Sequence, residues 1–306
     1  MTDLPVRRLA FSFDERTPFQ WNPANPAFGV SFNGFTFIAP AFERYMVAAT
    51  RMAMKEITDP AVLAEADAFL RQEATHARAH RNHAVALTRQ YPGLATISEE
   101  LDRRFDALLA TRTLRYHLAY AADIEATFTP MFDLMLRHKA HLFDNGDPQV
   151  APLFLWHLVE EIEHRSSAQT IYDAVVPSPW YRLRVAPGVF RHLLGCFNVV
   201  VRGLDAHVPR AVRLVDAADL VVSPRQFARS LAQRLRARGA PAAPNPFASV
   251  SWRETASLLY RLARSQRPGH SPAGERTPPF ADEWCAAYDR GHDVVHWYDV
   301  PAEEGS

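Results

Sequence analysis

Two short motifs, Glu73-Ala-Thr-His76 and Glu161-Ile-Glu-His164, lie within long stretches whose apolar residues recur every three or four positions. A spacing of three residues places the carboxylate and the imidazole of each pair on one face of a helix. An ionised carboxylate that faces a protein core costs several kcal/mol unless a partner or a metal ion neutralises it. The chain must therefore fold so that both helices direct their pairs toward a neutralising group.

Two further glutamates lie in apolar surroundings on neighbouring helical stretches, Glu43 within AFERYMVAA and Glu125 within YAADIEATF. In chain order, the four stretches carry one glutamate, one Glu-x-x-His pair, one glutamate and a second Glu-x-x-His pair. This is the inward-facing set with which a four-helix bundle holds two iron or manganese ions. The order and the spacing predict an all-α chain built on a four-helix bundle with a dimetal site.

Carboxylate oxygens hold and bridge two metal ions, and imidazoles add one neutral donor to each ion. Each ion would have one glutamate and one histidine as terminal ligands, and two glutamates would bridge the ions. The predicted terminal ligands are Glu43 with His76 and Glu125 with His164, and the predicted bridges are Glu73 and Glu161. Iron is the expected metal, with manganese or zinc as alternatives. In the competing interpretation the lone glutamates pair with arginines and both histidines are ordinary core residues.

Three more histidines flank the predicted ligands. His80 and His83 follow the second-helix ligand by one and two turns, and His157 precedes the fourth-helix glutamate by four residues. They would be additional ligands or proton carriers. We take His80 and His157 as the candidate catalytic residues, whereas a solvated position is the alternative for His83.

The register of the fourth helix rests on Glu161 facing inward. Glu160 and Glu163 point away from it by about 100° and 200° at 3.6 residues per turn. They are expected to contact neighbours or solvent, and Glu160 is the one rival to Glu161 as a ligand.

Proline and glycine positions suggest how the chain is divided. Residues 1–40 contain five prolines and alternating aromatic residues in 30–38 (VSFNGFTFI), which predicts an irregular arm with a short strand or hairpin. Residues 41–178 are expected to form the bundle, with helices near 40–58, 60–91, 101–140 and 148–176 and a kink at Pro130. Residues 179–306 would add helices near 180–222, 224–238, 249–265 and 280–294 as an extension packed on the bundle.

The composition excludes several classes of protein. The chain has 34 Lys and Arg residues against 34 Asp and Glu residues, so no basic surplus indicates binding to nucleic acid or to an anionic membrane. Two cysteines cannot form a disulfide framework, and the first ten residues lack the apolar core of a secretion signal. Residues 185–204 contain two arginines and a histidine and are too polar to span a membrane. A cytoplasmic protein is expected.

The segment Trp156-His157-Leu-Val-Glu160-Glu161-Ile-Glu163-His164-Arg165, together with Gln72-Glu73-Ala-Thr-His76, resembles the bacterial family of predicted metal-dependent hydrolases. The resemblance extends from the aromatic arm to at least Tyr172, and a basic Arg165 stands where lysine is expected. It implies a ferritin-like bundle related at a distance to di-iron carboxylate oxidases and oxygenases. The fold class expected is therefore all-α, a ferritin-like four-helix bundle with an N-terminal arm and additional C-terminal helices.

Three functions remain open from the sequence. Open coordination positions in a mixed carboxylate and histidine site favour, first, an oxygen-dependent di-iron oxidase or oxygenase of a small organic substrate. The alternative is a metal-dependent hydrolase, and the non-enzymatic alternative is iron binding or storage. An electron donor and a homodimer would be partners besides the substrate. Aromatic residues near the ligands would line a pocket or belong to the core: Phe42, Tyr45, Tyr120, Phe128 and Trp156.

A few other polar residues have spacings that could suggest a site. His292 and His296, with Asp289 and Asp293, have a metal-like spacing, but a solvated helix end is the favoured interpretation. Cys196 and Cys285 are expected in the core, and Arg182, Arg184 and Arg191 are expected at the surface rather than on an anionic substrate.

Overall fold

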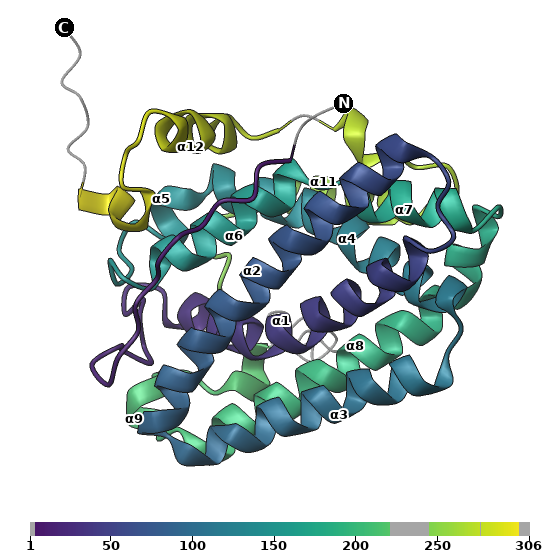
Figure 1. Ribbon diagram of the computed structural model, residues 1–306. Coiled ribbons are helices and arrows are strands. Elements are labelled where there is room, and N and C mark those ends of the chain that lie inside the picture. Colours follow the sequence, from purple (N-terminus) through teal and green to yellow (C-terminus); the bar gives the residue numbers. More distant parts are fainter. Residues whose placement is uncertain (1–3, 221–244, 276, 300–306) are drawn as a thin grey trace, which may run out of the picture.

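The computed structural model describes residues 4–220, 245–275 and 277–299, and within these ranges the fold is all-α without strands. Helices α1 (Pro26–Ala53) and α2 (Pro60–Gln90) pack along each other, and α4 (Leu114–Arg137) contacts α1, as Figure 1 shows. Helices α6 (Ala151–Glu163) and α7 (Ser167–Val175) pack against both α2 and α4. The fold class is confirmed as all-α, and its ferritin-like bundle architecture stays a prediction.

Helix α1 begins much earlier than the sequence indicated. It starts at Pro26, where the side chain of Asn25 accepts a hydrogen bond from the Phe28 amide, so the strand or hairpin expected at 30–38 is wrong. Pro40, expected as the first helical residue, lies inside the helix. Because 21 of its 28 residues are buried, the helix is covered on nearly all sides, and the alternating aromatic residues in 30–38 resemble a buried strand although they belong to this helix.

Helix α2 follows the prediction closely. Asp59 caps it by accepting a hydrogen bond from the Ala61 amide, and Pro60 occupies the first turn. The helix ends at Gln90, just before Pro92. One unbroken helix therefore carries both members of the first Glu-x-x-His pair.

The third expected helix is two helices. α3 (Ala95–Thr111) ends at Arg112, and α4 starts after Thr113, because both of these residues adopt extended backbone angles. Neither proline nor glycine marks this break. Pro130 lies inside α4 as expected, and α4 carries Glu125.

The fourth expected helix is also divided. α6 ends at Glu163, His164 is its C-terminal cap residue, and α7 begins at Ser167. The second Glu-x-x-His pair is therefore in the last turn of a helix rather than in the middle of one.

The remaining helices pack around these elements. α8 (Trp180–His207) contacts α1, α3 and α4, α11 (Trp252–Ser265) contacts α4, and α12 (Pro279–Asp289) contacts α6. The last helix ends before the expected 294, since Gly291 has a positive φ of 80°. The helix expected at 224–238 lies outside the described residues. Short helical turns complete the part of the chain that the structure describes: η1 (Pro92–Leu94), α5 (Lys139–Leu142), α9 (Arg210–Arg213), η2 (Ala217–Leu220), η3 (Pro272–Gly274) and η4 (Val294–Asp299).

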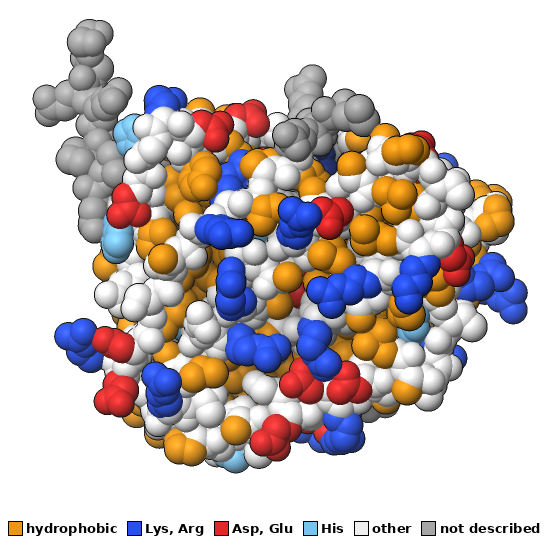
Figure 2. Space-filling view, viewed as in Figure 1, with side chains coloured by type: hydrophobic (Ala, Val, Ile, Leu, Met, Phe, Trp, Pro, Cys, Tyr) orange, Lys and Arg blue, Asp and Glu red, His pale blue; other side chains and the backbone are white. Residues whose placement is uncertain are grey.

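The surface agrees with the balanced composition. Figure 2 shows basic and acidic side chains interspersed over an apolar ground on the face that carries α2 and α3. Arg44, for example, pairs with Asp102 and Asp106. Across the described residues, none of the helices combines the length and the apolar character needed to cross a bilayer.

Candidate metal centre

The structure brings all six predicted metal ligands together in the core. They come from four helices and each is at most 3 % exposed: Glu43 on α1, Glu73 and His76 on α2, Glu125 on α4, Glu161 on α6 and His164 at its cap. Five of them, together with His157, form two groups, in each of which one donor atom per residue lies within 4.8 Å of the others, and Glu125 belongs to neither group. The first group is Glu43, His76 and His157, and the second is Glu73, Glu161 and His164.

Glu161 lies between the two groups. Its Oε1 is 3.2 Å from His157 Nε2 and 3.6 Å from His76 Nδ1, and its Oε2 is 3.2 Å from His164 Nε2. A carboxylate with one oxygen toward each group has the placement that a bridge requires.

Glu73 and Glu125 both lie beside His164. Glu73 Oε1 is 3.2 Å and Glu125 Oε2 is 3.9 Å from His164 Nε2. Glu73 therefore belongs to the second group, and its bridging role stays a prediction.

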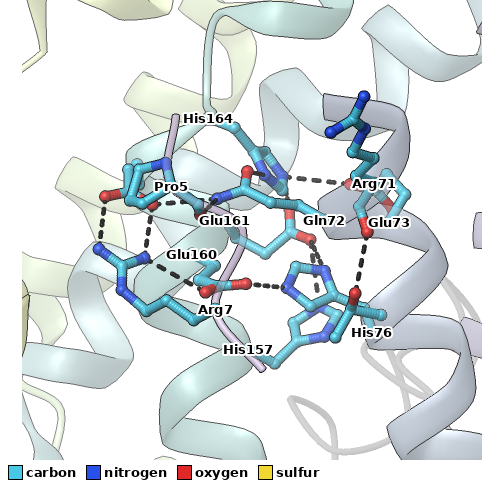
Figure 3. Close-up of polar contacts among 12 residues, drawn as sticks. Pro5, Arg7, Arg71, Gln72, Glu73, His76, His157, Glu160, Glu161 and His164 are labelled. Carbon is cyan, nitrogen blue, oxygen red and sulfur yellow. Dashed lines mark hydrogen bonds and ion pairs between the residues drawn. The ribbon is translucent and has the colours of Figure 1, made fainter. Parts of the chain in front are cut away.

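The imidazoles of His76 and His164 are each held by a hydrogen bond on the side that faces away from Glu161, which we call the outer side. His76 Nε2 is 2.9 Å from Glu160 Oε2, and His164 Nδ1 is 2.9 Å from Gln72 Oε1. Since a carboxylate and an amide oxygen only accept hydrogen bonds, these ring nitrogens carry the proton. The opposite nitrogens, His76 Nδ1 and His164 Nε2, then face the carboxylates, where a metal ion would displace any proton that they carry. Figure 3 shows Glu160 beside His76 and Gln72 beside His164, with Arg7 and Pro5 beyond them.

The outer partners, Glu160 and Gln72, are themselves held by the segment that precedes α1 (residues 4–25, the N-terminal segment). Arg7 Nη1 donates to Glu160 Oε1 at 3.2 Å and to Glu163 Oε2 at 2.8 Å, and Arg7 Nη2 donates to Glu163 Oε1 at 2.9 Å. Gln72 Nε2 donates to the Pro5 carbonyl and to Glu163, so its oxygen must face His164. Glu160 lies on the outer side of His76, and Glu161 is the residue that faces the donor groups.

A chain of buried side chains extends from His157. Its Nδ1 is 3.1 Å from His80 Nε2, His80 Nδ1 is 3.1 Å from Thr36 Oγ1, and Thr36 Oγ1 is 3.0 Å from His83 Nδ1. His83 is fully buried, so the solvated position considered for it is wrong. When each donor points outward along this chain, His157 Nε2 also presents a lone pair to Glu161.

The four inner carboxylates, which belong to Glu43, Glu73, Glu125 and Glu161, are buried close together, so their ionised forms are unfavourable unless a cation neutralises them. Burial raises the pKa values of Glu43, Glu73 and Glu125 well above the usual range, and the charge of Glu161 raises them further. Burial also opposes ionisation of Glu161, but the charge of His164 and hydrogen bonds from the histidines hold its pKa well below the usual range. Protons must therefore supply the positive charge that a metal ion would otherwise bring.

The histidines differ in the same environment. Burial disfavours charge on His76, yet hydrogen bonds to Glu160 and Glu161 raise its pKa to about 10. Burial lowers the pKa of His157 to about 4 and that of His83 to about 3, and it lowers that of His80 well below the usual range. The chain that starts at His157 is therefore neutral near pH 7.

The four inner glutamates together with His76, His157 and His164 form the inner set, and this set shows the pattern expected of metal ligands. Within the described residues, nine of the seventeen buried side-chain atoms without a hydrogen-bond partner lie here, on glutamate oxygens and on His76 Nδ1, His157 Nε2 and His164 Nε2. Buried polar atoms in native proteins are otherwise nearly always satisfied. Carboxylate oxygens with imidazole nitrogens, each imidazole fixed from outside, form a donor set that suits iron, manganese or zinc.

The other residues that the sequence singled out lie elsewhere. His292 and His296 are exposed, and His296 bonds only to the neighbouring Asp293. Cys196 is buried in the core, and Cys285 is partly buried beside Arg7. Arg182, expected at the surface, is buried and pairs with Asp123 at 2.9 Å.

The aromatic residues near the ligands are packed into the interior. Phe42, Tyr45 and Tyr120 pack against one another and against Phe105. The Trp156 ring lies 4.8 Å from the His76 ring.

Three residues that hold the candidate ligands or their hydrogen-bond partners in place were not predicted from the sequence. Arg7 is 153 positions from Glu160, Thr36 lies in the segment expected to be a strand, and Gln72 was noted only as part of the resemblance. The one signal in the sequence was that Gln72 directly precedes Glu73, a predicted ligand on the same helix.

The chain belongs to the family described as predicted metal-dependent hydrolases, whose sequence profile matches residues 5–244. The match includes the N-terminal segment from Pro5 and every inner and outer residue of the centre. No protein of curated function and no solved structure matches the chain.

Proposed function

We propose that this member of the family is a hydrolase that uses two metal ions, held between α1, α2, α4 and α6, to cleave an ester, amide or phosphoryl bond. Three residues would hold one ion, three would hold the other, and one would bridge them. These are Glu43, His76 and His157 for the first ion, Glu73, Glu125 and His164 for the second, and Glu161 as the bridge. In this assignment His157, expected as a catalytic residue or an additional ligand, is a ligand, and Glu73, expected as a second bridge, is a terminal ligand.

The observation that supports the proposal most directly is the orientation of the imidazoles. Two of them donate outward to groups that can only accept, and the third can donate outward to His80. All three therefore turn their second ring nitrogen toward Glu161, where a metal ion would displace any proton that it carries. Ordinary core histidines would have no reason to converge in this way, and no arginine pairs with Glu43 or Glu125 among the described residues.

Divalent ions in this donor set would activate a water molecule and polarise the bond to be cleaved. The chain itself supplies orientation. Glu160 fixes His76, Gln72 fixes His164, and His80 fixes His157 by accepting the proton of its Nδ1. His80 is thus a positioning residue, and the burial of the whole set excludes bulk water from it.

The family favours hydrolysis over the oxygen-dependent oxidase or oxygenase that the motifs alone placed first. The family membership gives no support to iron storage either. Zinc or manganese is the metal we propose for hydrolysis, and iron stays the alternative.

The test is hydrolysis by protein of defined metal content. Chelator-treated protein would be reloaded with Zn(II), Mn(II) or, without oxygen, Fe(II), and assayed with p-nitrophenyl esters, anilides and phosphates. We expect two ions per chain and hydrolysis of at least one bond type, without any need for oxygen, that is abolished by chelation. Absence of hydrolysis with every metal, together with oxygen uptake by the iron form, would overturn the proposal.

A further inference from the structure

A narrow cavity lies between α1, α4 and α8 and ends at the candidate metal centre. Its volume is about 40 Å³. Leu193 and Phe197 of α8 form its outer end, and Glu43 and Glu161 form its inner end. Phe197 is 38 % exposed, so the outer end is at the surface. The three helices that enclose the cavity lie side by side (Figure 1).

The wall of the cavity is apolar along its length. Nine of its eleven lining residues are apolar, and the two glutamates at the inner end are the exceptions. A charged or strongly polar group placed along this wall would lose its hydration without gaining a hydrogen bond. The wall therefore selects an apolar chain, and the inner end selects a single polar group.

The inner end contacts both halves of the metal centre. Glu43 belongs to the first group of donors, and Glu161 lies between the two groups. The Phe35 ring, part of the wall, packs edge-on against the His157 ring with centroids 5.0 Å apart. A polar group at this end would be next to the residues proposed to hold the metal ions.

The bore of the cavity restricts the shape of its occupant. Pockets for drug-sized ligands span about 300–1,000 Å³, far more than this cavity. A single water molecule needs about 10–15 Å³ of such volume, so at about 40 Å³ the cavity has room for a short unbranched segment and not for a ring or a branched group. Phe128 at the outer part is partly buried and Phe197 is exposed, so a longer chain would continue past these rings toward the surface.

We propose that the substrate is an aliphatic acyl compound, an ester or amide whose unbranched chain lies between α1, α4 and α8 and whose carbonyl lies beside Glu43 and Glu161. The bond that is cleaved rests on the proposed function, whereas recognition of the aliphatic chain does not. Binding and turnover therefore test the two proposals separately.

The binding test uses alkyl hydroxamates with two, four, six and eight carbons, titrated calorimetrically into zinc-loaded protein of measured metal content. Each buried methylene should tighten binding about four-fold until the chain fills the cavity. Benzohydroxamate should bind more weakly than the six-carbon chain. Equal affinity along the series, or a preference for the ring, would overturn the proposal even if hydrolysis is observed.

Adjacent residues of α8 provide a matched pair of variants. Leu193 lines the cavity, whereas Leu194 is exposed and does not. Leu193→Glu should weaken binding of the eight-carbon hydroxamate by at least ten-fold and leave acetohydroxamate within two-fold, and Leu194→Glu should change neither. Phe197→Glu, at an exposed position, repeats the test where folding is not at risk. Equal effects of Leu193→Glu and Leu194→Glu would overturn the placement of the chain.

Turnover separates the two proposals. With p-nitrophenyl acetate, butyrate, hexanoate and octanoate, kcat/KM should rise with chain length in the wild type and lose this rise in Leu193→Glu. Chain-dependent binding without any hydrolysis would leave the cavity assignment intact and refute the hydrolase. Hydrolysis with no dependence on chain length would do the reverse.

Discussion

Three glutamates in one short stretch of α6 are neutralised in different ways. Glu160 and Glu163 meet the guanidinium of Arg7 at 2.8–3.2 Å on the outer side of the helix. Glu161, on the inner side, faces imidazoles and other carboxylates. The fold thus supplies its own cation to the outer glutamates, whereas it supplies only histidines to the inner one.

This difference shows which glutamates need a proton or a metal ion in addition to the side chains around them. A buried carboxylate with a buried arginine is complete, since each ion satisfies the other. Four buried carboxylates that share three imidazoles are not complete unless protons or metal ions join them. The inner set therefore has the electrostatics of a binding site, and the outer set has those of a support.

The largest effect is expected from removing the inner charge between the two groups. Glu161→Gln keeps the shape of the side chain but removes the bridge, so the protein should lose at least one ion and all hydrolysis. Glu163→Gln, two residues along the same helix, should retain both ions because its partner is Arg7. Metal content after dialysis, measured by plasma emission spectroscopy, checks both variants. Loss of metal from Glu163→Gln with retention in Glu161→Gln would reverse the assignment of inner and outer faces.

Next in size is the removal of the outer cation. Arg7→Met leaves the buried Glu160 with His76 as its one ionic partner, and loss of one member of a buried ion pair costs about 3–5 kcal/mol. Urea unfolding of the metal-free protein would measure it. Arg44→Met, which removes half-exposed pairs with Asp102 and Asp106, should cost at most about 1 kcal/mol. Equal costs would mean that the outer glutamates need no buried cation.

The same contrast explains what could be predicted from the sequence. The inner set was predictable because each Glu-x-x-His pair is local, and helix geometry alone places its two side chains together. His157 was also within reach, four residues before Glu161 on the same face. The all-α class followed from the same periodic patterns.

The outer set and several helix boundaries depended on contacts that no local pattern records. Arg7 reaches Glu160 from 153 residues away. The early start of α1 was concealed because the alternating aromatic residues in 30–38 resemble a strand, whereas the structure buries them within a helix. The breaks at Arg112 and His164 carry no proline or glycine, so packing between helices rather than local preference sets them.

A smaller, pH-dependent effect should separate the metal-free protein from the loaded one. The pKa values of Glu43, Glu73 and Glu125 are raised by burial, so their contribution to stability is present below their unfolded pKa and is lost as pH rises. His76 acts in the same direction, with its contribution lost as pH rises through about 10. Metal ions displace these protons, so metal affinity should increase with pH. The Tm difference between zinc-loaded and metal-free protein should therefore widen from pH 6 to pH 9, and a constant difference would contradict the predicted protonation of the empty site.

The smallest effect on metal binding is expected at Gln72, which contacts both His164 of the inner set and Glu163 on the outer side of α6. Its oxygen fixes His164, and its nitrogen ties that contact to Pro5 and Glu163. Gln72→Leu should weaken metal binding about 10- to 100-fold without removing a ligand, as measured by competition with a chromophoric chelator. Gln90→Leu is the matched control, because Gln90 is also on α2 and also donates to the N-terminal segment, at the Thr17 carbonyl, but it touches no ligand. If both variants bound metal as tightly as the wild type, the outer set would stabilise the fold without orienting the inner one, and the convergence of the imidazoles would have to come from helix packing alone.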